Sequence, residues 1–197
     1  NPSINVDFRT FGDSNTKLYL EHTTAVFSNI KSTVTPIEKS VSFYYDHPLI
    51  SPRIHPRLDT INKNSNLMEV SGDNILYFGM IEGKAQVKCN KLVYDPQSPV
   101  NPIPFSQTGS STNELAIVIN YHEASLMAGG NDIEKITNFF FTEEKAGVLV
   151  LKMGAKGAMV FDDASSKGIH IPVFKTESVW PIGSGDVFAS VFSYYWF

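Results

Sequence analysis

A short turn near the end of the chain carries the residue types that phosphate chemistry requires. Gly183, Ser184, Gly185 and Asp186 come directly before an apolar stretch with helical spacing. The glycines allow consecutive backbone N–H groups to converge on one point at the positive end of that helix. An oxyanion bound at this point would lie beside the Asp186 carboxylate. The turn therefore predicts an anion site next to a base.

The helix after this turn is expected to hold Asp186 in a fixed direction. Apolar residues recur along it at helical spacing, which predicts one buried face. These residues are Val187, Phe188, Val191, Phe192 and Tyr195. Taken alone, the turn also has a simpler explanation, because glycine, serine and aspartate commonly cap the free N–H groups at the start of a helix.

A second segment pairs an amide with a carboxylate. Asn120 stands at the end of an expected strand, and Glu123 follows about one turn into the next expected helix. Facing one cleft, Glu123 would hold a hydrated divalent cation and Asn120 would orient water or phosphate. The alternative is that Asn120 caps the helix and Glu123 complements the helix dipole.

A third segment runs from Lys152, at a strand end, into a turn that contains Gly154 and Gly157. A hairpin between two strands needs only the glycines, so the structural explanation is again sufficient for this segment alone. The order and separation of the three segments support a functional interpretation more strongly than any one segment does.

The elements that must position these residues change along the chain. Residues 1–60 favour strands, at 4–8, 23–27 and 41–45, and little there looks helical. From about residue 70, strands are expected at 75–78, 92–95, 116–120, 148–151 and 158–161. Helices are expected at 80–90, at 123–128 and after a cap at Asn131 or Asp132.

This alternation predicts an α/β fold with a mainly parallel sheet and helices on both faces. In such sheets ligands bind beyond the carboxyl ends of the strands. Asp95, Asn120, Lys152 and the turn at 183–186 all fall at such ends. We therefore expect the polar candidates to line one edge of the sheet.

The composition sets broad limits. The length of 197 residues fits a single domain, with 42% apolar and 18% charged residues. A net charge of −4 predicts no general attraction to nucleic acid or to an anionic membrane. Cys89 is the single cysteine, which excludes an internal disulfide and favours a cytoplasmic location. Because the chain starts at Asn1 and ends within a helical pattern, we expect that both ends have been trimmed.

The order Asn-x-x-Glu, Gly-x-x-Gly and Gly-x-Gly-Asp resembles the ribokinase-like (PfkB) family of sugar and nucleoside kinases. Residues 92–97 are similar to that family's strand ending in Asp-Pro, and the resemblance covers about residues 70–197. Residues 1–7 are similar to its first strand, whose acidic residue contacts substrate hydroxyls. The β-rich stretch at 12–47 is similar to its lid sheet. Lys152 stands where the family usually has threonine, and Ser184 where it has alanine.

The resemblance implies a role for each candidate residue. Asp186 would be the catalytic base, with the backbone amides of Gly183, Ser184 and Gly185 as the anion hole. Asn120 and Glu123 would organise magnesium and phosphate. Gly154 and Gly157 would lie in the turn that approaches the nucleotide, with Lys152 reaching a phosphate, and Asp7 would contact the substrate. The implied cofactors are ATP and Mg²⁺.

The expected activity is ATP-dependent phosphorylation of a hydroxyl group on a small sugar or related polyol. A nucleoside kinase of the same fold is an alternative, as is a non-catalytic protein of this fold that binds a sugar or nucleoside. An unrelated doubly wound binding protein would require all three segments to be accidental. The expected partners are a small-molecule substrate and a second copy of the chain, paired through the lid, but neither nucleic acid nor membrane.

Overall fold

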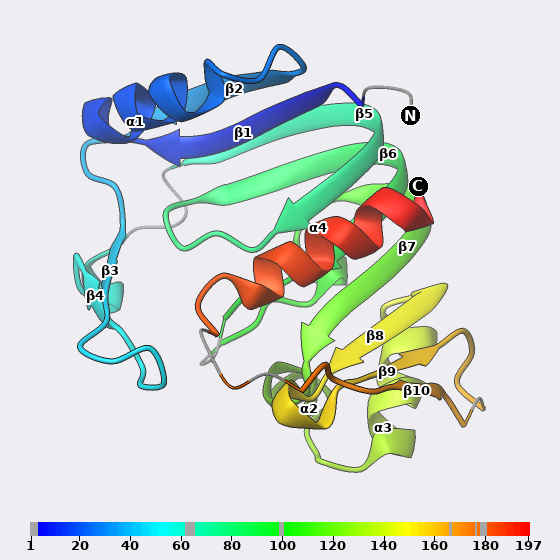
Figure 1. Ribbon diagram of the computed structural model, residues 1–197. Coiled ribbons are helices and arrows are strands. Elements are labelled where there is room, and N and C mark those ends of the chain that lie inside the picture. The colour runs from blue at the N-terminus through cyan, green and yellow to red at the C-terminus, as the bar shows by residue number, and fades with distance from the viewer. Residues whose placement is uncertain (1–3, 62–65, 99–100, 166, 176, 178–180) are drawn as a thin grey trace. The chain divides into compact units, whose positions relative to one another are not determined.

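The computed structural model describes residues 4–61, 66–98, 101–165, 167–175, 177 and 181–197 (Figure 1). Contacts divide the chain into two compact units. The first unit comprises residues 1–46, 50–68 and 81–84, and the second comprises 47–49, 69–80 and 85–197. A single domain with a β lid at 12–47 stays a prediction.

The first unit begins with a parallel strand pair joined by a helix. Strand β1 pairs with β2, and a short antiparallel pair, β3 and β4, follows later in the chain. The elements are β1 (Val6–Gly12), α1 (Ser14–Thr24), β2 (Ile30–Pro36), β3 (Ser42–Tyr44), β4 (Arg53–His55) and the 3₁₀ turn η1 (Leu58–Thr60).

Helix α1 corrects the expectation that the first sixty residues are free of helix. Residues 17–20, whose polar and apolar side chains alternate as in a strand, lie within α1. The strand expected at 23–27 is also wrong, because residues 23 and 24 end α1 and residues 25–27 form no strand. Two parallel strands that are neighbours in sequence need a crossover between them, and α1 supplies it. Asp13 fixes its start: the carboxylate accepts a hydrogen bond from the Thr16 amide at 2.9 Å.

Most of the second unit is built on one sheet. In the described part of the chain it has six strands in the order β10-β9-β8-β7-β6-β5. Strands β6, β7 and β8 are parallel, whereas β9 and β10 are added antiparallel. The strands are β5 (Leu67–Phe78), β6 (Lys84–Asp95), β7 (Ser111–Asn120), β8 (Val148–Lys152), β9 (Ala158–Phe161) and β10 (Ile169–Ile171).

The helix expected at 80–90 is wrong, because β6 occupies most of that stretch. Ala85, Val87 and Cys89 are buried and the residues between them are exposed. This alternation has the period of a strand with one face against the core, not the period of a helix.

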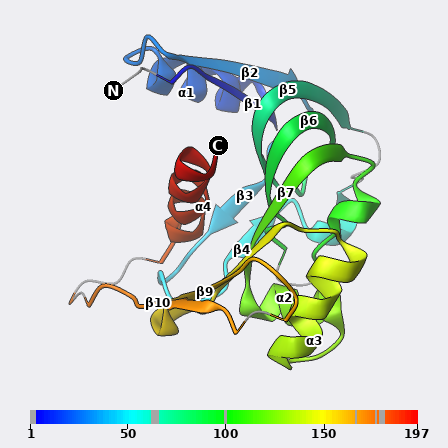
Figure 2. The same ribbon diagram turned by 90° about the vertical axis from the view of Figure 1, so that its right-hand side faces the viewer.

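Helices cover both faces of this sheet, as expected (Figure 2). Helix α4 (Ser184–Trp196) lies on one face, where its Ala189 packs with Val93, Ala116, Val118 and Val150. On the other face lie α2 (Tyr121–Ala128), α3 (Ile133–Asn138) and the π-helical turn η3 (Phe139–Glu143). The predicted fold, a mostly parallel sheet between helices, is confirmed.

The buried face of α4 differs from the one expected. Ala189 and Ser193 are buried, whereas Val187 is 63% and Tyr195 80% exposed. Small side chains four residues apart let the helix approach the sheet closely. Asp186 precedes Ala189 by three residues, so it lies at the start of the same row, at the sheet edge. The direction of Asp186 is thus fixed by this row and not by the larger apolar residues.

Candidate active site

The last residues of three neighbouring parallel strands meet at one edge of the sheet. Asp95 ends β6, Asn120 ends β7 and Lys152 ends β8, and Asn120 lies opposite Lys152 in the strand register. The Lys152 Nζ atom lies 2.6 Å from Asp95 Oδ2. The strand-end residues predicted to share an edge are therefore brought together.

Asp95 is the most deeply buried member of this group. Its side chain is 1% exposed, and that of Lys152 is 17% exposed. Burial raises the pKa of the Asp95 carboxyl, an effect opposed by the Lys152 ammonium and increased by the Asp186 carboxylate. Within the described residues, Asp95 Oδ1 is buried without a hydrogen-bond partner. Asp95, Lys152 and Asp186 therefore form one electrostatic cluster.

Asn120 and Glu123 form a capping box at the start of α2. Asn120 Oδ1 accepts a hydrogen bond from the Glu123 amide at 2.9 Å, and Glu123 Oε2 accepts one from the Asn120 amide at 3.4 Å. Glu123 is 3% exposed, and both burial and the neighbouring Asp95 carboxylate raise its pKa. The capping role is thus observed, and a metal-binding role stays a prediction.

The turn before α4 differs in part from the expected anion hole, because the Ser184 amide donates to the Pro181 carbonyl at 3.1 Å. Gly183 is the N-cap residue, with φ of +78°, a conformation that favours glycine. A Cβ atom placed on Gly185 would lie 3.5 Å from Lys152 Nζ. The turn at 183–186 and the Lys152 ammonium are therefore neighbours, and the exposed Asp186 side chain begins in the same turn.

Gln97 is a site residue that sequence reasoning missed. Its Nε2 donates a hydrogen bond to Asp186 Oδ1, and its backbone adopts a left-handed φ of 46°. A left-handed conformation at a residue other than glycine often marks a functional position. The available signal was its place directly after the strand end at Asp95-Pro96.

The turn with two glycines joins β8 to β9 through a 3₁₀ turn, η4 (Gly154–Lys156). The Met153 amide donates to the Gly157 carbonyl at 2.8 Å. Gly157 has φ of +87°, and a Cβ atom there would lie 2.1 Å from the Ile171 carbonyl oxygen. The close passage of β10 therefore requires glycine at 157, and a nucleotide-binding role for the turn stays a prediction.

Asp7 lies in the first unit, on β1, and forms an ion pair with Arg9 at 2.7 Å. Its proposed contact with substrate stays a prediction. The part of the first-strand resemblance that falls on residues 1–3 lies outside the described residues, as does Trp180 before the anion-hole turn.

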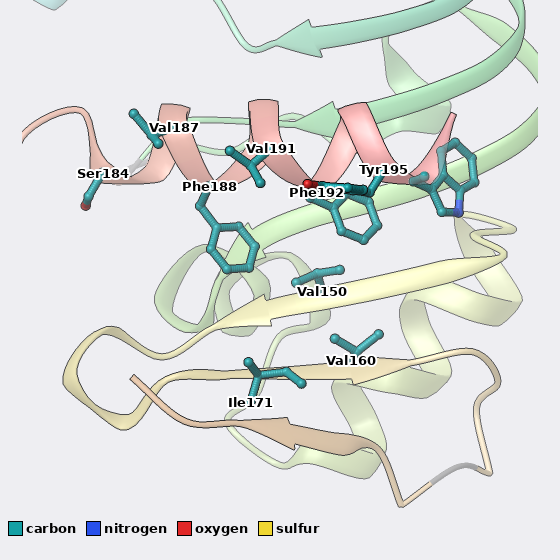
Figure 3. Close-up of a pocket in the computed structure, with 10 residues that line it drawn as sticks. Val150, Val160, Ile171, Ser184, Val187, Phe188, Val191, Phe192 and Tyr195 are labelled. Atoms are coloured by element: carbon teal, nitrogen blue, oxygen red, sulfur yellow. The ribbon is translucent and has the colours of Figure 1, made fainter. Parts of the chain in front are cut away.

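An apolar groove of about 670 Å³ lies beside α4 (Figure 3). None of its described lining residues carries a charge, so it does not offer a phosphate site. The lining residues are Val150, Val160, Ile171, Ser184, Val187, Phe188, Val191, Phe192, Tyr195 and Trp196. The charged cluster at the strand ends is therefore the better candidate for chemistry.

The described residues include neither a metal-binding cluster of side chains nor a membrane-spanning helix. They contain no group of three or more histidine, cysteine, aspartate or glutamate side chains that could hold a metal ion. No described helix is long and apolar enough to cross a membrane.

Comparison with known proteins decides the family. The model of the pfkB family of carbohydrate kinases matches residues 84–196, more than half of the chain. The chain belongs to this family. Every site residue named above, except Asp7, lies in the matched part of this pfkB-family chain. No curated protein matches it significantly.

Several solved structures with the same fold are kinases. A fructokinase from Vibrio cholerae O395 superposes with a TM-score of 0.63 at 12% identity over 97% of this chain and 70% of its own. A ribokinase from Thermotoga maritima has a TM-score of 0.57 at 15% identity, over 94% of this chain and 65% of its own. An adenosine kinase from Sinorhizobium meliloti has a TM-score of 0.61 at 8% identity, over 98% of this chain and 66% of its own. The pfkB-family chain thus spans about two thirds of their length.

Proposed function

We propose that this chain is the catalytic part of an ATP- and magnesium-dependent kinase that phosphorylates a hydroxyl of a small sugar or related polyol. The observation that carries the proposal is the exposed Asp186 carboxylate on the first turn of α4, next in sequence to Gly185, whose Cβ position lies 3.5 Å from the Lys152 ammonium. A base next to an anion site is what transfer of a phosphoryl group to a hydroxyl requires.

Asp186 accepts the proton of the acceptor hydroxyl in this proposal. Gln97 holds one carboxylate oxygen of Asp186 by a hydrogen bond, which restricts the rotation of the base. The amides of Gly183 and Gly185 would face the transferred group at the positive end of α4, whereas the Ser184 amide donates to the Pro181 carbonyl at 3.1 Å. Alignment of the reacting groups and stabilisation of their negative charge supply most of the rate in such reactions.

The donor set at the strand ends fits a magnesium ion that arrives with nucleotide phosphates. Magnesium is usually held by one or two carboxylates together with water and substrate phosphates. Glu123 supplies a buried carboxylate, and Asn120, next to it, orients water or phosphate. When bound, the ion would neutralise charge on the phosphates. The absence of a larger carboxylate cluster in the described residues agrees with this kind of site.

The nucleotide is proposed to approach the turn that contains Gly154 and Gly157, which follows Lys152 on β8. The similar fructokinase was solved with fructose, ADP and a calcium ion, and its fold is shared by this chain. A nucleoside acceptor is the alternative, supported by the similarity to an adenosine kinase. A cytoplasmic location and a homodimer through the lid stay predictions.

Replacing Glu123 with Gln tests the magnesium part of the proposal. The amide keeps the shape of the side chain but loses the charge that attracts the cation, so the magnesium concentration for half-maximal turnover should rise about tenfold or more. The measurement is turnover of the full-length protein against magnesium concentration.

Glu144→Gln is the matched control for this change. Glu144 is also a buried carboxylate, 5% exposed, and it accepts a hydrogen bond from the Ser106 hydroxyl. It should leave the magnesium response unchanged. Identical magnesium curves for Glu123→Gln and the parent would exclude a metal role for Glu123.

A further inference from the structure

We propose that Lys152 is a fixed cation for the transferred phosphoryl group, and that Asp95 is the residue that positions it. The inference rests on the proposed kinase function and adds a charged group to its anion site. It is drawn from the contacts of the Lys152 ammonium, which joins the end of β8 to the turn before α4.

The position of Lys152 is set from two sides. Asp95 Oδ2, at the end of β6, holds its ammonium at 2.6 Å across the end of β7. On the other side, the ammonium lies 3.5 Å from the point where a Gly185 Cβ would stand. Because Gly185 has no side chain, nothing from this residue fills the space between the ammonium and the first turn of α4, so one anion can contact the ammonium and the Gly185 amide.

The ammonium also retains the capacity to bind an anion. A lysine carries three N–H donors. Among the described residues, Asp95 is its one hydrogen-bond partner, which leaves two donors for a ligand. The side chain is 17% exposed, so that solvent screens it less than a surface lysine.

A contribution to the stability of the fold does not explain the ion pair between Lys152 and Asp95. Removing two charges from water at a buried position costs roughly what their attraction returns, and a pair of apolar side chains is often as stable. Moreover, Asp95 Oδ1 is buried and, within the described residues, unpartnered. The presence of this buried pair is explained if the Lys152 ammonium binds an anionic ligand.

In the transfer step, Lys152 neither gains nor loses a proton. The bond from the terminal phosphorus to the ADP oxygen breaks as the bond to the acceptor oxygen forms. The hydroxyl proton passes to Asp186, and the electron pair of the broken bond stays on ADP. Lys152 keeps its proton throughout and stabilises the charge that spreads over the transferred oxygens.

The experiment compares Lys152→Met, Asp95→Asn and the double variant with the parent, in the full-length protein. Lys152→Met should lower kcat about 10²-fold, the effect of losing one charge-stabilising donor. It should also lower Tm, because Asp95 is left buried without a partner. Asp95→Asn should reduce kcat about tenfold with an unchanged KM for the acceptor, since its amide holds the ammonium less firmly.

The double variant decides between a catalytic and a structural role. With both charges removed, Tm should return toward the parent value while kcat stays about 10²-fold low. Recovery of both Tm and kcat would overturn the proposal, because Lys152 would then only neutralise Asp95. Lys91→Met serves as the control: Lys91 pairs with Glu114 at 3.5 Å, partly exposed, and its loss should leave kcat unchanged.

If the parent protein shows no turnover, the kinase function is refuted. The role of Lys152 is then tested by anion binding. The binding of inorganic phosphate is measured by isothermal titration calorimetry. The parent should bind phosphate at least tenfold more tightly than the double variant. Equal affinities would overturn the role of Lys152 as an anion-binding cation.

Discussion

Replacing Asp186 with Asn is expected to lower turnover of the full-length protein by roughly 10²–10⁴-fold while substrate binding is retained. The amide has the shape of the carboxylate but cannot accept the hydroxyl proton. Gln97 can still donate to its oxygen, so the side chain should keep its position. The measurements are steady-state kinetics and thermal unfolding on one preparation.

Stability should change little, because the N-cap of α4 is Gly183 and not Asp186. The carboxylate contributes at most about 1 kcal/mol through the helix dipole. Glu134→Gln is a matched control, since Glu134 is an exposed carboxylate in the first turn of α3. It should alter neither turnover nor Tm. Near-parental turnover of Asp186→Asn at an unchanged Tm would remove Asp186 as the base.

Gly185→Ala should lower turnover about 10²-fold without loss of stability. A Cβ atom at this position meets no described atom within 4 Å except Lys152 Nζ, at 3.5 Å. Alanine is also favoured over glycine inside a helix by roughly 0.5–1 kcal/mol. The methyl group would, however, fill the space between the ammonium and the anion-hole amides, with an effect like the loss of one donor.

Gly183→Ala provides the contrast to this variant. Its φ of +78° makes alanine unfavourable by about 1–2 kcal/mol, so Tm should fall. Kinetics and thermal unfolding of the two variants separate an effect on the anion site from an effect on the fold. Parental turnover of Gly185→Ala would show that no anion uses the space beside Lys152.

The parts of the fold predicted from sequence were those with a strong local signal. The buried runs that end at Asp95, Asn120 and Lys152 have the length and composition of central strands, and such strands place their carboxyl ends together. The cap at Asp132 and the capping box at Asn120 follow equally from local hydrogen-bonding chemistry.

The errors arose where long-range contacts decide. Leu18 and Leu20 gave α1 an alternating pattern, but the parallel pairing of β1 with β2 requires a crossover there. Along α4, residue size suggested that Phe188 faces the core, whereas close approach to the sheet selects Ala189. The place of Gln97 after the strand end at Asp95-Pro96 puts it at the sheet edge, but only the fold shows that its side chain reaches Asp186, far along the sequence.

Acceptor-dependent formation of ADP by the full-length protein tests the central claim most directly. The protein is supplied with ATP, magnesium and, one at a time, a panel of sugars, polyols and nucleosides, and the phosphorylated product is identified by phosphorus NMR. The account predicts that ADP and a phosphate ester of a sugar or polyol hydroxyl form in equal amounts, and that Asp186→Asn abolishes most of both. Binding of acceptor and nucleotide without any phosphate ester would contradict it.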